Sequence, residues 1–345
     1  MKRVRRRGEQ IRTFIIKNVD KHKSDIARVT ASKFKISRQA VNKHLTRLVE
    51  EESLVSEGTT RSRKYFLRPI EKWDKSYVLD SSIQEDVVWR NDIAPSLEQL
   101  PDNVFDIWHY GFTEMFNNAL DHSEGSRVIV ALEKTATHTG IGLMDDGVGI
   151  FKKIQGELGL LDERHSVLEL SKGKLTTDPA NHTGEGIFFT SRVFDEYQIL
   201  SGGVYFSHEF DKQEDWILER MRFDSGTGVR MKINNHTART LKRIFNQYTS
   251  ADDIGFSKTV VPVKLAQYGD DKLVSRSQAK RLLVRVDRFK TVIFDFKGVD
   301  GVGQAFADEV FRVFANKNPD IELIHMNANA EVKRMILRAE SLDAA

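Results

Sequence analysis

Two short motifs constrain this chain more than any other feature of its sequence. In the first, within the stretch FTEMFNNALDHS, Glu114 lies four residues before Asn118. Residues four apart share one face of a helix, where the carboxylate can take a proton and the amide oxygen can hold a magnesium ion. The second motif, Asp145-Asp146-Gly147-Val148-Gly149, places a carboxylate beside two glycines, where backbone can approach a flat ligand closely. We therefore expect a ligand site built from both motifs.

Two later segments extend the pattern. They are His182-Thr183-Gly184-Glu185-Gly186, which precedes a helix-like run, and Ser225 to Ile233 (SGTGVRMKI). Each motif alone is weak, because a Gly-x-Gly usually means a turn and a helical Glu-x-x-x-Asn a solvated face. The four in this order resemble the GHKL nucleotide-binding fold, which is shared by histidine kinases, anti-sigma-factor serine kinases, mismatch-repair ATPases, type II topoisomerases and heat-shock chaperones. The resemblance covers roughly residues 88 to 235 and implies ATP and Mg2+ as cofactors.

The resemblance also implies roles for individual residues. Glu114 would be the catalytic base, Asn118 the magnesium ligand, and Asp145 the acceptor of a hydrogen bond from the adenine amino group. Gly147 and Gly149 would shape the pocket floor. Amides of the second glycine segment would face phosphate oxygens at a helix N-terminus. The other cofactor-binding residues that the resemblance implies are Thr183, Gly184, Glu185, Gly186 and Thr227.

Some polar residues of the helix motif have a structural alternative. Glu114 can instead be a carboxylate that only pairs with a nearby base. Asp121 and His122 either orient the site or cap and pack the helix end. His122 is left outside the catalytic set, because a single histidine at a helix end is more often structural than functional.

Residues 151–183 correspond to the lid that closes over triphosphate in GHKL proteins. This segment contains Lys172-Gly173-Lys174, basic groups beside a glycine that allows movement. Lys172 and Lys174 are therefore predicted to contact phosphate. The alternative for either lysine is a solvated loop charge.

Composition indicates a cytoplasmic protein of several domains. A length of 345 residues suggests two or three units, and a hydrophobic fraction of 40% can fill ordinary cores. With 0 Cys, neither a disulfide framework nor a cysteine-ligated metal site is expected. No apolar run approaches the roughly 20 residues that span a bilayer, and the basic N-terminus is not followed by a signal-type apolar core. No membrane partner is expected.

The charge is distributed unevenly along the chain. Residues 1 to 70 contain 19 Lys plus Arg and 7 Asp plus Glu, a formal charge of +12. Subtracting these from the totals of 53 and 50 leaves 34 and 43 for residues 71 to 345, a formal charge of −9. The first segment is thus a separate basic unit. Such a unit suits a polyanion, of which nucleic acid is the commonest inside cells.

The pattern of this basic unit predicts helices followed by a hairpin. Gly8 to Val19 has helical periodicity, and Ser37 is a candidate N-cap for a helix that runs to about Glu50. That helix would bury Ala40, Val41, Leu45 and Leu48 while its polar residues point outward. Leu54 to Gly58 and Lys64 to Leu67 are expected to form the two strands of a hairpin with a basic tip.

This order of elements over residues 1–68 resembles a winged helix-turn-helix domain, most of all in ISRQAVNKHLTRLVEEESLV. The resemblance implies double-stranded DNA as a partner, with the helix that follows Ser37 in the major groove. The implied DNA-binding residues are Arg38, Gln39, Asn42 and Lys43 on that helix, of which the first three are best placed for base edges, and Arg61, Arg63 and Lys64 at the hairpin. The alternative is a winged helix used for protein contacts or dimerisation.

Residues 69–87 are interpreted as a connector, and residues 236–345 as a small α/β domain. In the latter, expected strands at Thr259 to Leu265, Thr291 to Phe296 and Ile321 to Met326 alternate with expected helices. The stretch TVIFDFKGVDGVGQAFADEVF is similar to the STAS fold of anti-anti-sigma factors. These factors commonly carry a phosphorylatable serine where this chain has Gly301 to Ala305, so no phospho-switch is expected. The STAS-like domain is still expected to dock on the ATPase domain or on a second copy of the chain. Gln304 is either a contact in that interface or a loop residue that closes a turn.

The sequence therefore predicts a multidomain α+β protein: winged helix, GHKL α/β sandwich and STAS-like domain. The predicted function is an ATP-binding, weakly ATP-hydrolysing DNA-binding regulator, in which the nucleotide state of the GHKL domain controls the winged helix and the STAS-like module. A regulatory protein partner is expected through the STAS-like domain, and homodimerisation is expected from family resemblance alone. One alternative is a protein serine/threonine kinase, because Glu114, Asn118, Ala119 and His122 resemble the N box of anti-sigma kinases. Another is a DNA-stimulated ATPase of genome defence. A histidine kinase is disfavoured, since no long dimerisation helix with a phosphoacceptor histidine precedes residue 100.

Overall fold

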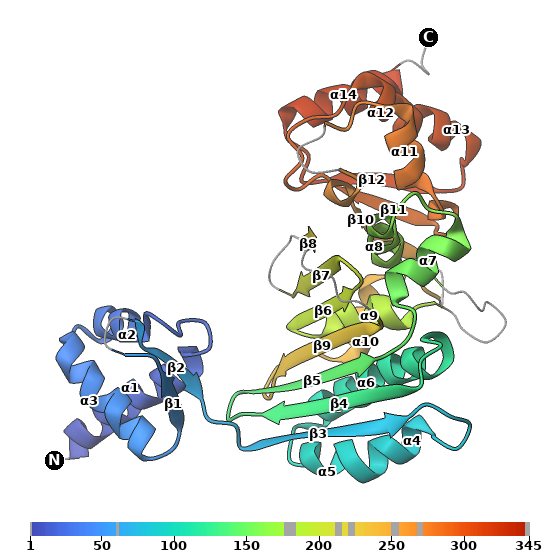
Figure 1. Cartoon of the computed structure of the whole chain (residues 1–345). Coiled ribbons are helices and arrows are strands. Elements are labelled where there is room, and N and C mark those ends of the chain that lie inside the picture. Colours follow the sequence, from blue (N-terminus) through green and yellow to red (C-terminus); the bar gives the residue numbers. More distant parts are fainter. Residues whose placement is uncertain are drawn as a thin grey trace. The chain divides into compact units, whose positions relative to one another are not determined.

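The computed structural model describes residues 2–59, 62–175, 184–210, 216–219, 225–249, 255–267 and 272–341 (Figure 1). The chain divides into two compact units. Unit 1 comprises Met1–Asp74, Ala131–Gly140 and Asn234–His236. Unit 2 comprises Lys75–Val130, Ile141–Ile233 and Thr237–Ala345. The basic residues predicted to bind DNA belong to unit 1. The motifs around Glu114 and Asp145 belong to unit 2.

The N-terminal part of unit 1 consists of three helices and a two-stranded hairpin. These are α1 (Lys2–Asn18), α2 (Ile26–Phe34), α3 (Arg38–Glu50), β1 (Leu54–Glu57) and β2 (Lys64–Leu67). Ser37 caps α3, because its Oγ accepts a hydrogen bond from the amide of Ala40 at 3.2 Å. Val41 and Leu45 are completely buried against Ile15. The four-residue apolar spacing therefore directs one face of α3 into the core and leaves the basic face outside.

A seven-stranded sheet follows, in the order β3-β4-β5-β9-β6-β7-β8. Its strands are β3 (Glu71–Val78), β4 (Arg127–Lys134), β5 (His138–Asp145), β6 (Glu196–Ser201), β7 (Val204–Glu209), β8 (Trp216–Glu219) and β9 (Thr227–Asn234). Strand β6 pairs antiparallel with both β7 and β9. Alternate residues of β6 are buried, as expected for a sheet with one face against the core.

The segment 69–87, interpreted from sequence as a connector, contains strand β3 at the edge of this sheet. In β3 only Tyr77 is buried. A strand is recognised in sequence by alternation of apolar and polar residues, and β3 has too little of it. Its mostly polar composition therefore resembles that of a linker. The structure therefore corrects the connector interpretation for Glu71–Val78.

Helices of unit 2 bury their apolar residues against the sheet. They are α4 (Glu85–Val88), the π-helix η2 (Trp89–Ile93), α5 (Ala94–Leu97), α6 (Asp102–His122), α7 (Ile150–Leu158), α8 (Glu163–Lys172), α9 (Gly186–Val193) and α10 (Leu241–Gln247). The longest, α6, buries Trp108, Phe112 and Phe116 completely. The rings of Trp108 and Phe194 lie 4.7 Å apart between centroids, so α6 is held close to the end of α9.

The C-terminal part of unit 2 is built on a parallel sheet in the order β10-β11-β12. Its strands are β10 (Lys258–Pro262), β11 (Thr291–Asp295) and β12 (Glu322–Met326). The intervening elements are the 3-10 helices η3 (Val263–Ala266) and η4 (Val286–Arg288), the π-helix η5 (Glu309–Phe314), and α11 (Arg276–Leu283), α12 (Gln304–Asp308), α13 (Ala315–Lys317) and α14 (Ala330–Ser341). Parallel strands require such crossovers. The predicted alternation of strands and helices is confirmed here.

Among the residues with described positions, no helix combines the length and apolar character needed to cross a bilayer. This finding agrees with the absence of a long apolar run in the sequence.

Two helical glycines in unit 2 provide a matched test of packing. A Cβ at Gly111 of α6 would lie 2.4 Å from the Phe194 ring, whereas a Cβ at Gly156 of α7 would meet no atom within 4 Å. Alanine gains about 1 kcal/mol of helix propensity at either site. Overpacking costs about 1–3 kcal/mol, and the fully buried Phe194 cannot move aside without disturbing Trp108. In urea denaturation, Gly111→Ala should lower the free energy of unfolding and Gly156→Ala should raise it. Equal effects of the two substitutions would contradict this packing argument.

Candidate functional site

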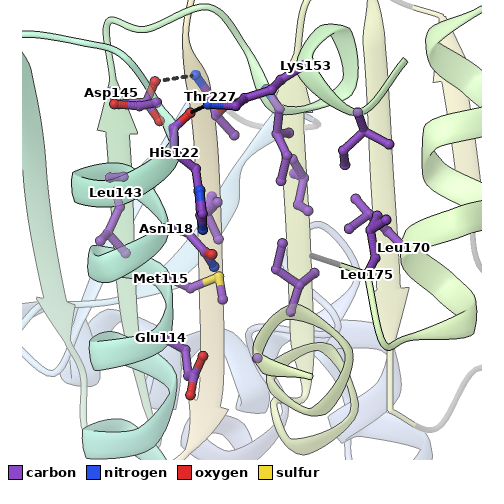
Figure 2. A pocket seen from close by; sticks show the side chains of 18 of the residues that line it. Glu114, Met115, Asn118, His122, Leu143, Asp145, Lys153, Leu170, Leu175 and Thr227 are labelled. Atoms are coloured by element: carbon purple, nitrogen blue, oxygen red, sulfur yellow. Dashed lines mark hydrogen bonds between the residues drawn. The ribbon is translucent and has the colours of Figure 1, made fainter. Parts of the chain in front are cut away.

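A cavity of about 300 Å³ lies in unit 2 against helix α6. Its walls come from α6, β5, α7, the end of α8, the start of α9, β6 and β9. Figure 2 shows side chains from α6 on one side of the cavity and Leu170 and Leu175 across from them. Residues of both sequence motifs therefore line the same cavity.

Helix α6 presents a polar row to the cavity. Glu114, Asn118 and His122 line it at intervals of four residues, which places all three on one helical face (Figure 2). The Nδ2 atom of Asn118 is buried, and no described residue accepts a hydrogen bond from it. Leaving a buried amide without an acceptor costs about 1–3 kcal/mol. Such an atom at a cavity wall is available to an acceptor that enters the cavity, such as a water molecule or a ligand group.

Asp145 ends strand β5 at another edge of the cavity and is only 8% exposed. Its Oδ1 atom accepts hydrogen bonds from the amide of Gly147 at 3.0 Å and from the amide of Thr227 at 3.1 Å. Burial raises the pKa of Asp145, and the two backbone hydrogen bonds oppose that rise. The carboxyl group is thus fixed in orientation by backbone on two sides.

Gly147 and Gly149 do not line the cavity but shape the turn beside it. A Cβ at Gly147 would lie 2.0 Å from the carbonyl oxygen of Ser123, so a side chain there would push the turn away from the end of α6. Gly149 is the N-cap residue of α7. The Oγ1 atom of Thr227, which does line the cavity, accepts a hydrogen bond from the amide of Ile150 at 2.9 Å.

The second glycine segment meets Glu114. Gly184 and Gly186 line the cavity where α9 begins, and a Cβ at Gly186 would lie 1.9 Å from Oε2 of Glu114. A side chain at position 186 would therefore displace the Glu114 carboxylate from this position. Glu185 is the N-cap residue of α9 and is not a wall residue. Burial raises the pKa of Glu185, while Lys174 opposes the rise. Thr183 lies outside the described residues.

The two lysines predicted to contact phosphate do not line the cavity. The fully buried ammonium of Lys172 donates to Oε1 of Glu169 at 2.6 Å and to the carbonyl oxygen of Val284 at 2.8 Å. That of Lys174 donates to the carbonyl oxygen of Arg288 at 3.0 Å. In this structure both lysines bond to the segment after α11.

A different lysine, Lys153 of α7, does line the cavity. Its ammonium donates to the carbonyl oxygen of His122 at 2.9 Å (Figure 2). It also donates to Oε1 of Glu124 at 2.8 Å. Lys153 was not selected from sequence, although it lies between the wall residues Ile150 and Ile154 at helical spacing. His122 was set aside as structural, yet it is also a wall residue.

The predicted DNA-binding residues of α3 are all exposed in unit 1. Arg38, Gln39, Asn42 and Lys43 are exposed, whereas Val41 and Leu45 of the same helix are buried. At the hairpin, Arg63 and Lys64 are exposed as well. Arg61 lies outside the described residues. The exposed face of α3 is therefore polar and basic, as its pattern indicated.

Comparison with known proteins gives one family match. A family model described as a STAS-like domain of unknown function (DUF4325) matches residues 278–333. The C-terminal part of the chain is STAS-like. The match runs from α11 through β11 and β12 into α14, so it covers most of the parallel sheet and its crossovers. No curated protein matches the chain.

Asp145 allows a test of how the site is built. In Asp145→Asn the side-chain oxygen can still accept from Gly147 and Thr227, so the free energy of unfolding at pH 7 should equal or exceed that of the unmodified chain. Asp145→Ala leaves both amides without their acceptor and should cost about 1–3 kcal/mol.

The pH dependence has a defined sign. Because the folded-state pKa of Asp145 is raised, the folded state binds the proton more tightly than the unfolded state, and the penalty of the buried charge disappears as pH falls through that pKa. Any stability advantage of Asp145→Asn in chemical denaturation should therefore shrink as pH falls from 7 towards the ordinary aspartate pKa of 3.8. An advantage that grows over this range would contradict the buried-carboxylate assignment.

Proposed function

We propose that the cavity binds ATP with Mg2+ in a GHKL-type domain, and that the chain is a DNA-binding regulator whose winged helix responds to the nucleotide. One observation carries the nucleotide proposal. A buried carboxyl group on β5, an amide without an acceptor on α6 and a carboxylate one helical turn from that amide line the same cavity. These are the groups that the sequence motifs predicted for adenine, magnesium and the reacting phosphate.

The residues at one end of the cavity fit an adenine ring. Asp145 would accept a hydrogen bond from the exocyclic amino group through Oδ2, since among the described residues its two backbone donors both bond to Oδ1. Leu143, Ile199 and Val229 supply apolar wall for a flat ring. Fixing the carboxyl group beforehand lowers the ordering cost of binding.

The residues of α6 fit a magnesium–phosphate group. Asn118 would supply its amide oxygen to Mg2+, and its Nδ2 atom would then donate to a phosphate oxygen. The bound ion would neutralise phosphate charge as the terminal bond breaks. Glu114 would accept the proton of the attacking water as the phosphorus–oxygen bond forms, and ADP and phosphate would leave.

A second candidate, protein phosphorylation, is favoured by the helix motif. Glu114, Asn118 and His122 resemble the N box of anti-sigma serine kinases, and the same chain contains a STAS-like segment. In this reaction Glu114 would deprotonate a serine or threonine hydroxyl in place of water. Transfer of labelled γ-phosphate to a protein would support it, and release of free phosphate alone would count against it.

Unit 1 would supply the DNA-binding surface. By the winged-helix resemblance, Arg38, Gln39 and Asn42 would contact base edges, while Lys43, Arg63 and Lys64 would bind phosphates. All six are exposed, and the +12 formal charge of residues 1 to 70 favours a polyanion.

The nucleotide proposal is tested by Glu114→Ala. Removal of a general base should reduce ATP turnover about 100-fold to 10,000-fold while ATP binding, followed by calorimetry with Mg2+, is retained. Glu157→Ala, which removes an exposed carboxylate of α7, is the matched control and should turn over ATP normally. If Glu114→Ala hydrolysed ATP at the control rate, Glu114 would not be the base.

The DNA proposal is tested by fluorescence anisotropy on duplex DNA selected for binding to the unmodified chain. Arg38→Ala should cost about 1–3 kcal/mol and relax the sequence preference at one position. Lys64→Ala should weaken binding to all sequences and reduce the slope of log affinity against log salt by about 1. Identical DNA affinities without nucleotide, with ADP and with a slowly hydrolysed ATP analogue would exclude nucleotide control.

A further inference from the structure

The end of α8 lies between the cavity and the STAS-like part of unit 2. Leu170 and Leu175 line the cavity, while the residues between them contact the segment that follows α11. Leu175 is in turn bonded to the second glycine segment, because its amide donates to the carbonyl oxygen of Gly184 at 3.0 Å. Residues 172–174, which bond to the segment after α11, thus lie in the chain between two wall residues of the cavity.

Three buried charged groups form the contact. Glu169 and Lys172 of α8 have side chains 2% and 0% exposed, and the side chain of Arg285 is 9% exposed. The carboxylate of Glu169 accepts from Lys172 at 2.6 Å and from Arg285, 116 residues later in the chain, at 3.1 Å. A buried carboxylate shared by two cations is an arrangement in which removal of one partner has a large effect.

Side chains of each segment also donate hydrogen bonds to backbone carbonyl groups of the other. Lys172 donates to the carbonyl oxygen of Val284 at 2.8 Å, and Arg285 donates to the carbonyl oxygens of Gly173, at 3.2 Å, and Lys174. The Oγ1 atom of Thr259 on β10 adds a hydrogen bond to the carbonyl oxygen of Lys172 at 2.7 Å. We call these interactions of Glu169, Lys172, Arg285 and Thr259 the latch.

The backbone at Arg285 is shaped for this contact. Arg285 has φ 60° and ψ 7°, a left-handed conformation that costs an ordinary residue about 1 kcal/mol or more. It is retained where surrounding contacts overdetermine it. A planar guanidinium can bond one carboxylate and two carbonyl groups at once, which an ammonium on a flexible stem cannot do in the same geometry.

We infer that Arg285 is a positioning residue for the cavity, which holds the wall formed by Leu170 and Leu175 and so couples ligand binding to the attachment of the STAS-like segment. The inference rests on the proposed ATP site. It gives Lys172 a role in the latch in place of phosphate binding. Arg285 itself touches neither Glu114 nor Asn118, so it acts on affinity and not on the proton-transfer step.

The test compares Arg285→Met with Lys280→Met, which removes an exposed cation of α11 in the same part of the chain. ATP affinity is measured by calorimetry with Mg2+, turnover by phosphate release, and exchange of the Leu175 amide by hydrogen–deuterium exchange. Arg285→Met should weaken ATP binding by about 5-fold to 150-fold, raise KM and leave turnover at saturating ATP unchanged, with faster Leu175 exchange. Lys280→Met should match the unmodified chain in all three.

Arg285→Lys keeps the charge and guards against a variant that simply fails to fold. Compared with Arg285→Met, Arg285→Lys should restore thermal stability more fully than ATP affinity, because lysine keeps the charge but lacks the planar, multiply donating guanidinium. Equal ATP affinity in Arg285→Met and the unmodified chain would overturn the inference while the ATP site stands. Failure of the unmodified chain to bind ATP would overturn both. A lower kcat with unchanged KM in Arg285→Met would also overturn the inference, since Arg285 would then affect the hydrolysis step and not ATP binding.

Discussion

The site depends on one carboxyl group that joins two distant parts of the chain. Oδ1 of Asp145 accepts from Gly147, in the turn after β5, and from Thr227, which begins β9. The same threonine accepts from the first amide of α7. These bonds set where the end of β5, the start of β9, the turn and α7 meet, and the cavity lies beside them against α6. Because the acceptor is buried, its bonds are stronger than they would be in water, and its loss is correspondingly costly.

A second constraint is the desolvation cost of burying charged groups next to the cavity. Glu169, Lys172 and Arg285 are removed from water, and desolvation lowers the pKa of Lys172 to about 8 and also lowers the pKa of Arg285. Attraction to Glu169 opposes both shifts. Such groups contribute little net stability compared with apolar residues of the same volume. What they provide is a specific geometry, since this arrangement of α8 and the segment after α11 brings the carboxylate, both cations and the backbone carbonyl groups within hydrogen-bond distance.

Local pattern predicted those parts of the structure in which neighbouring residues decide the outcome. The four-residue spacing of Glu114 and Asn118, the cap at Ser37 and the strand–helix alternation from β10 to α14 are all found in the structure. Strand β3 was not predicted, because an edge strand with a single buried residue lacks the alternation that indicates a strand. The sequence Lys172-Gly173-Lys174 does not distinguish between lysines that bind phosphate, lysines exposed to solvent and lysines paired with a buried carboxylate. Glu169, three residues before Lys172, was the available local signal, but Arg285 is too distant in sequence to be paired with it by pattern.

By itself, the sequence determined which residue types were available for chemistry and where helices and strands carry them, because helical and strand periodicities are local properties of the backbone. It also determined the basic character of the first 70 residues and the STAS-like pattern near the end. The tertiary structure alone decided that Lys153 lines the cavity and that Lys172 and Lys174 bond to the segment after α11. These outcomes depend on which segments pack together, and that choice is made by burial and hydrogen bonding between residues far apart in the chain.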